Sequence, residues 1–123
     1  MRSFYVLDEE VVLNESLGRV TVVRAGGEID YAASPHLRER LSAAVKPDGP
    51  PLIIDLLGAT FIDSTAIGVL VATATRMREL GSATAILCAD PQILKIFQIV
   101  SLEDIVDVCE SREQALESLA SIV

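Results

Sequence analysis

The sequence predicts one α/β domain in which a mixed sheet of four or five strands carries about four helices. The chain has 123 residues, half of them hydrophobic, which suits a single domain with its own core and argues against long disorder. Short apolar runs alternate with segments of helical periodicity in the order β-β-α-β-α-β-α-β-α. Such alternation is typical of parallel strands joined by helical crossovers, and the opening hairpin adds an antiparallel edge. We therefore expect residues 1–123 to form one domain.

The first part of the chain predicts a β-hairpin. Residues 11–13 and 19–24 are apolar runs that flank a turn ending in glycine. Both alternating sets of the second run are mostly apolar, so this strand should lie in the interior of its sheet. Residues 1–9 are expected to form either an edge strand or a loose N-terminal segment. Gly26 and Gly27 are expected to bend the chain after the second strand.

A turn-rich segment separates the first predicted helix from the next strand. Ser34 is expected to be the N-cap of that helix, with Pro35 at its first position. Residues 46–51, rich in proline and glycine, end the helix. Residues 52–56 then predict a short buried strand, and residues 57–62 a loop.

The longest predicted helix runs over residues 65–80, and Gly81 is suited to end it. We expect Ser64 to be its N-cap, because a short hydroxyl side chain can accept a hydrogen bond from a free N–H of the first turn. At ~100° per residue, one arc faces the core and contains Ala66, Ile67, Leu70, Ala74 and Met77. The other arc contains Thr65, Gly68, Val69, Ala72, Thr75, Arg76 and Glu79. This second arc is either the solvent-facing side of an alanine-rich helix or a docking surface beside Ser64.

The C-terminal third predicts two further strand–helix pairs. Residues 83–88 and 105–109 are the predicted strands. A helix begins at Asp90-Pro91 after the first of them, and Ser111 is expected to cap the helix after the second.

Composition excludes several functional classes. The net charge of −8 argues against nucleic acids and anionic membranes as direct partners. The sequence shows no signal peptide and no apolar run near the ~20 residues of a membrane span, so a cytoplasmic protein is expected. We expect no cofactor and no metal, because phosphate-binding glycine motifs are missing and His36 is the only histidine. His36 is expected on the surface, and nothing in the sequence places it near Ser64 to build a catalytic triad.

The two cysteines, Cys88 and Cys109, end two of the predicted strands. If those strands are neighbours, a disulfide is conceivable. In a cytosolic protein we expect two buried thiols instead.

Four segments resemble one known family. Residues 61–69 (FIDSTAIGV) are similar to the signature of the STAS domain of anti-sigma factor antagonists. Residues 27–30 (GEID) resemble the second motif of that family, and residues 52–56 resemble its central strand. Residues 89–91 resemble the entry to its third helix. The resemblance covers roughly residues 11–120 and follows the family's order of elements.

This resemblance implies a binding protein rather than an enzyme. Its unphosphorylated form would bind an anti-sigma factor with serine-kinase activity and so free a sigma factor. Phosphorylation of Ser64 would break that complex, and a serine phosphatase would reset it. Thr65-Ala66 stands where the best-known members have Ser-Gly, so Thr65 is a second possible acceptor. Combining the resemblance with the small-residue arc of the predicted helix, we expect the partner-binding residues to be Asp30, Asp63, Thr65, Ala66, Gly68, Val69 and Ala72.

A phosphate on Ser64 is physically compatible with this position. Phosphoserine carries about −1.5 to −2 charges at neutral pH, and free N–H groups at a helix N-terminus favour such a dianion. A partner packed against Ser64 would meet its charge and bulk, with Asp30 and Asp63 adding to the negative field. The local pattern alone favours a simple cap, and the resemblance favours the switch. The alternative function is a STAS subunit that docks on a membrane transport complex or on a signalling assembly without a sigma factor.

Overall fold

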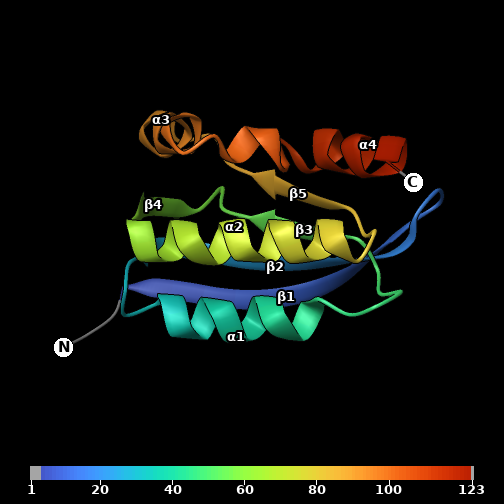
Figure 1. Ribbon diagram of the computed structural model, residues 1–123, viewed down its shortest axis with the longest axis horizontal. Coiled ribbons are helices and arrows are strands. Elements are labelled where there is room, and N and C mark those ends of the chain that lie inside the picture. Colours follow the sequence, from blue (N-terminus) through green and yellow to red (C-terminus); the bar gives the residue numbers. More distant parts are fainter. Residues whose placement is uncertain (1–3, 123) are drawn as a thin grey trace.

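The computed structural model describes residues 4–122 and confirms a single-layer mixed sheet packed with four helices (Figure 1). Its elements in chain order are β1 (Tyr5–Asn14), β2 (Gly18–Ile29), α1 (Ser34–Ala44), β3 (Leu52–Asp55), β4 (Ala59–Ile62), α2 (Ser64–Glu79), β5 (Thr84–Leu87), α3 (Pro91–Ile99), the 3-10 helix η1 (Leu102–Asp104), β6 (Asp107–Cys109) and α4 (Arg112–Ile122). The α/β class and the expected alternation of strands and helices are therefore confirmed.

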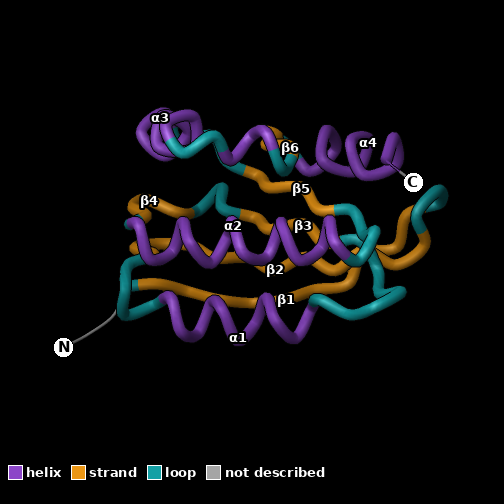
Figure 2. The backbone as a smooth tube through the Cα atoms, viewed as in Figure 1, coloured by secondary structure: helices purple, strands orange, loops and turns teal. Residues whose placement is uncertain are grey.

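The strands form one sheet in the order β1-β2-β3-β5-β6, with β4 pairing with β2 outside this path (Figure 2). β1 is antiparallel to β2, and the other pairs are parallel. This is the expected antiparallel edge on a parallel sheet. The 12 residues of β2 serve two neighbours, because β3 pairs with residues 21–24 and β4 with residues 27–29.

Two of the expected strand boundaries are wrong. The loop expected over residues 57–62 contains β4, whose ends are buried while Thr60 and Phe61 between them are exposed. Such a short strand has neither clean alternation nor a continuous apolar run, so its sequence does not reveal it. The strand expected over residues 105–109 is confined to β6, because Ile105 and Val106 form a turn between η1 and the strand.

The two glycines expected to bend the chain lie inside β2, so that expectation is also wrong. The strand continues to Ile29, and its register with β4 shifts between Gly27 and Glu28. Gly27 has a φ of +81°, and a Cβ atom there would lie 2.3 Å from the carbonyl oxygen of Phe4. Only glycine fits this position, which is a bulge within a continuous strand.

The N-terminal segment is an edge strand from Tyr5 onward, as one of the two alternatives predicted, and residues 1–3 lie outside the described residues. Charged side chains tie this edge to its neighbours. Arg24 of β2 pairs with Glu10 of β1 at 3.3 Å, and Arg112 of α4 reaches the same carboxylate at 2.6 Å.

The helices bury both faces of the sheet. Alternate residues of β3 show this, because Leu52 and Ile54 belong to the core under α1, α2 and α3, whereas Ile53 belongs to the core under α4. The predicted core-facing arc of α2 is confirmed. Its five members, Ala66, Ile67, Leu70, Ala74 and Met77, are all buried.

The predicted helix caps have different outcomes. Ser111 accepts a hydrogen bond from the Gln114 N–H at 3.1 Å, which confirms it as a cap. Ser34 is not a cap, because it is the first residue of α1 and follows Ala33 at the cap position. Its hydroxyl is buried and donates to the carbonyl oxygen of Asp30 at 2.8 Å.

Within residues 4–122, none of the helices combines the length and the apolar character needed to cross a membrane.

Candidate functional site

The predicted motif lies where β4 turns into α2. β4 ends at Ile62, and α2 begins at Ser64. The Asp63 N–H between them donates to the carbonyl oxygen of Ile29, the last residue of β2, at 3.3 Å. This bond places Asp63 beside Asp30, the residue that follows β2, so the structure brings the two predicted aspartates to the same end of the sheet.

Asp63, rather than Ser64, is the N-cap of α2. Its backbone is extended, and its Oδ1 accepts a hydrogen bond from the Ala66 N–H at 3.0 Å. The prediction that Ser64 caps this helix is therefore wrong. Aspartate and serine cap about equally well, and the residue that still has the extended conformation of the strand takes the position.

This arrangement leaves the Ser64 hydroxyl available. Ser64 is exposed at the first helical position, and its side chain has no hydrogen-bond partner among the described residues. The adjacent Thr65 is exposed as well. Both hydroxyls lie at the end of α2 where the first N–H groups of the helix create a positive potential.

Asp30 has a local structural role of the same kind. Its Oδ1 accepts hydrogen bonds from the N–H groups of Ala32 at 3.0 Å and Ala33 at 3.1 Å. The Asp30 carboxylate thus holds the turn into α1, as the Asp63 carboxylate holds the start of α2. One of these fixed carboxylates directly precedes the exposed serine, and the other lies at the same end of the sheet.

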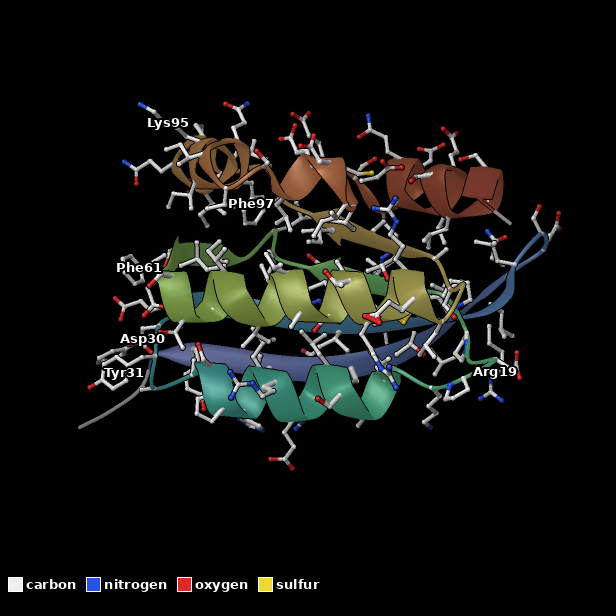
Figure 3. All side chains as sticks on the ribbon, in the orientation of Figure 1. Arg19, Asp30, Tyr31, Phe61, Lys95 and Phe97 are labelled. Carbon is white, nitrogen blue, oxygen red and sulfur yellow. The ribbon has the colours of Figure 1, made fainter. Side chains whose placement is uncertain are left out.

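Sequence reasoning missed two aromatic residues at this end. Tyr31 is 67% exposed and Phe61 is 50% exposed. Figure 3 shows both side chains, with Asp30, at the end of the molecule where α2 begins. Phe61 pairs in register with Glu28 of β2, on the strand that leads to Tyr31. The available signal was a large aromatic side chain in a polar turn and another in a motif next to the serine.

The small-residue arc of α2 is only partly exposed. Thr65, Gly68 and Ala72 are exposed, as predicted. Ala66 and Val69 are 0% and 3% exposed, so neither side chain lies on the solvent-facing side of α2, and their contact with a partner stays a prediction. α1 packs beside α2 on the same face of the sheet and buries the side of α2 that carries Val69. The periodicity of α2 identifies only the side that faces the sheet, so it could not predict this second buried side.

Gly68 indicates independently that another protein chain could come close to the backbone of α2. A Cβ atom at this position would meet nothing within 4 Å inside the domain. Glycine in a helix interior costs about 1 kcal/mol relative to alanine, and the packing of the domain does not require it here. An exposed position without a side chain allows another backbone to come close to α2.

The described residues contain no group of three or more ligating side chains that could hold a metal ion. His36 is half-buried rather than on the surface as expected, and its Nδ1 lies 3.3 Å from the Tyr5 hydroxyl. The Tyr5 ring packs edge-on against it at 6.0 Å. These contacts involve β1, and among the described residues no hydrogen bond joins His36 to Ser64, so the structure gives a catalytic triad no support.

The two cysteines are free thiols on opposite faces of the sheet. The Cys88 N–H donates to the carbonyl oxygen of Cys109 at 2.9 Å, so the backbones are neighbours. The Cys88 side chain belongs to the core under α1–α3, whereas the Cys109 side chain packs on the core under α4. Cys88 is buried as expected, and Cys109 is only half-buried. Burial raises the pKa of both thiols.

Comparison with known proteins identifies the family. Residues 12–115 match the STAS domain. The chain belongs to the STAS domain family. The resemblance that the motif indicated is thereby confirmed, and the four segments that carry it all lie in β2, β3, the β4–α2 junction and the start of α3 of this STAS domain.

This STAS domain is similar to three known proteins in sequence or in structure. It is 30% identical over 95 residues to the anti-sigma-B factor antagonist of Bacillus subtilis, covering 77% of this chain and 86% of that protein. A solved anti-sigma factor antagonist from Mycobacterium paratuberculosis has a TM-score of 0.78 at 23% identity, over 93% of this chain and 94% of the other. The Bacillus cell fate determinant SpoIIAA in its phosphorylated form has a TM-score of 0.65 at 20% identity, over 90% and 98% of the two chains. The two structural likenesses show the shared fold.

Proposed function

We propose that this STAS domain is an anti-sigma factor antagonist controlled by phosphorylation of Ser64. Its unphosphorylated form binds an anti-sigma factor that has serine-kinase activity, and the phosphate releases that partner. The observation that carries the proposal is the start of α2, where Asp63 fills the cap position and Ser64 keeps an exposed, unused hydroxyl. The name of the Bacillus subtilis relative supports the class of partner.

Because of the position of Ser64, a phosphate on this residue should weaken partner binding without destabilising the fold. A phosphate at the first position of α2 faces free N–H groups, so the domain tolerates the dianion. The same dianion in a protein interface must be desolvated without a matched cation, which costs several kcal/mol. Asp30 and Asp63 already place two carboxylates nearby, and their field opposes a further negative charge in the interface.

The proposed docking surface consists of Thr65, Gly68 and Ala72 on α2 together with Tyr31 and Phe61. The aromatic pair supplies exposed apolar area of the kind that is enriched at the centre of interfaces. Gly68 lets the partner approach the helix backbone. Ser64 is the first residue of α2, at the end of the molecule that carries both aromatic side chains, so a phosphate there would enter the proposed surface.

The proposal assigns the main phosphate to Ser64 rather than Thr65. The test captures the anti-sigma factor from native lysate on the unphosphorylated protein, adds ATP and maps the phosphate by mass spectrometry. We expect phosphate on Ser64 in the native chain and in Thr65→Val, and none in Ser64→Ala. A dominant phosphate on Thr65 would contradict the assignment.

Release is tested on the same captured partner. Calorimetric titration should show binding at least ~100-fold weaker for the purified phosphoprotein, since several kcal/mol of desolvation oppose it. Ser64→Ala should bind as the native chain does and stay bound when ATP is added. Treatment of the phosphoprotein with a serine phosphatase should restore binding. Tight binding by the phosphoprotein would end the proposal.

A further inference from the structure

α1 and α2 lie side by side on one face of the sheet (Figure 1). Residues of both helices line a groove with a volume of about 490 Å³. α1 and the residue after it supply one wall, and α2 supplies the other. The lining residues are Arg38, Ser42 and Val45 on one side and Val69, Ala72, Thr73 and Arg76 on the other. Ser64 is not part of the groove, and Ala72 is its only member within the proposed docking surface.

The floor of the groove is apolar and its rim is cationic. Val69 is almost fully buried, and the Thr73 hydroxyl donates to the Val69 carbonyl oxygen at 2.8 Å, so this polar group is satisfied within α2. The only charged side chains in the lining are Arg38 and Arg76. Both are exposed, and within residues 4–121 neither forms an ion pair, unlike Arg24, which pairs with two carboxylates of β1.

The two arginines lie at opposite ends of the groove. α1 and α2 run side by side in the same direction (Figure 1), so Arg38 lies near the Val69 end and Arg76 near the Val45 end. Val69 and Arg76 are seven residues apart on one helix, which corresponds to about 10 Å along the axis. The backbone positions of the two arginines are therefore about two helical turns apart along the groove, on opposite walls.

We propose that this groove binds an acidic amphipathic helix of a partner protein. Such a helix would present two carboxylates about two turns apart to Arg38 and Arg76 and would place apolar side chains between them on the Val45–Val69 floor. A singly charged amphiphile would satisfy only one arginine. Two parallel helices with an open groove also offer the ridges against which a third helix packs. Binding here is independent of the phosphorylation state of Ser64.

The test uses a synthetic probe rather than a cellular partner. The probe is a fluorescent, alanine-rich helical peptide with two glutamates seven positions apart and two leucines between them, and the matched peptide has lysines in place of the glutamates. Fluorescence anisotropy with the full chain should show binding of the glutamate peptide only. The double variant Arg38→Glu/Arg76→Glu should bind the glutamate peptide at least tenfold more weakly and should bind the lysine peptide instead.

Arg78→Glu is the control variant, because Arg78 is an exposed arginine of α2 that lines a different hollow, next to η1. It should leave the binding of both peptides unchanged. Arg38 and Arg76 are exposed, so the double variant should fold, and thermal melts check this. Equal binding of both peptides, no binding up to about 1 mM protein, or no effect of the double charge reversal would overturn the proposal. A dimer that the glutamate peptide dissociates in ultracentrifugation would assign the groove to a second copy of this chain and would overturn it too.

Discussion

α1 and α2 both begin with a serine that follows an aspartate-containing turn, and the two serines have opposite environments. Ser34 is 1% exposed, and its hydroxyl donates to the Asp30 carbonyl oxygen. Ser64 is exposed, and Asp63 alone provides the cap of its helix. The residue type and the position in the helix are the same at both sites. The turn before each helix therefore determines whether the serine hydroxyl is accessible, and of these two serines only Ser64 presents its hydroxyl to solvent.

The largest effect should come from placing a carboxylate at each serine. Ser34→Asp puts a buried charge against the Asp30 carbonyl oxygen and should lower the free energy of unfolding by about 3 kcal/mol. Ser64→Asp adds an exposed charge at the favourable end of α2 and should raise it by about 0.3–1 kcal/mol. In thermal melts, Ser34→Asp should have a lower melting temperature than the native chain, and Ser64→Asp should have a higher one. An unchanged melting temperature of Ser34→Asp would contradict the buried position of Ser34.

A smaller effect is expected from removing the α2 cap. Asp63→Ala should cost about 1 kcal/mol, because the Ala66 N–H loses its acceptor. Asp63→Asn keeps an acceptor oxygen and should cost less, so the pair separates the hydrogen bond from the charge. Urea unfolding measures both. Equal stability of Asp63→Ala and the native chain would contradict the contribution assigned to the hydrogen bond between Asp63 and the Ala66 N–H.

The smallest effects should come from removing the hydroxyls. Ser34→Ala loses a buried hydrogen bond but should cost only about 0.5 kcal/mol, because the Asp30 carbonyl oxygen keeps the Ser34 N–H as a donor. Ser64→Ala removes an exposed group that caps nothing and should change stability by less than about 0.5 kcal/mol. Urea unfolding of the two alanine variants measures both changes in the free energy of unfolding, and each variant is a control for the other. A loss of more than 1 kcal/mol in Ser64→Ala would mean that this hydroxyl has a structural role.

The sequence predicted those elements whose pattern is local. The core arc of α2, the edge hairpin and the Ser111 cap follow from periodicity and turn chemistry. β4 could not be found because a four-residue strand with exposed inner positions carries no periodic signal. The bulge at Gly27 could not be distinguished from a bend, since the contact that requires glycine is with Phe4, far away in the sequence.

The candidate site was predicted in outline and missed in detail for similar reasons. The signature over residues 61–69 located Ser64, but Asp63 and Ser64 compete for one cap position. Only the extended backbone at the end of β4 decides between them. Val69 was assigned to the wrong side of α2 because its burial depends on α1. Tyr31 lay outside the motif, so its proximity to the site required the fold.

The pairing of β4 with β2 also constrains how the chain length can change over generations. A one-residue insertion or deletion between β3 and Ser64 would slip this short strand and exchange buried Ile62 with exposed Phe61. The serine would move by about 3.3 Å relative to Asp30. The hairpin turn and residues 46–51 are under no such restriction. Genomic variants of this protein should therefore gain and lose residues in those two places, and the spacing from Leu52 to Ser64 should stay constant.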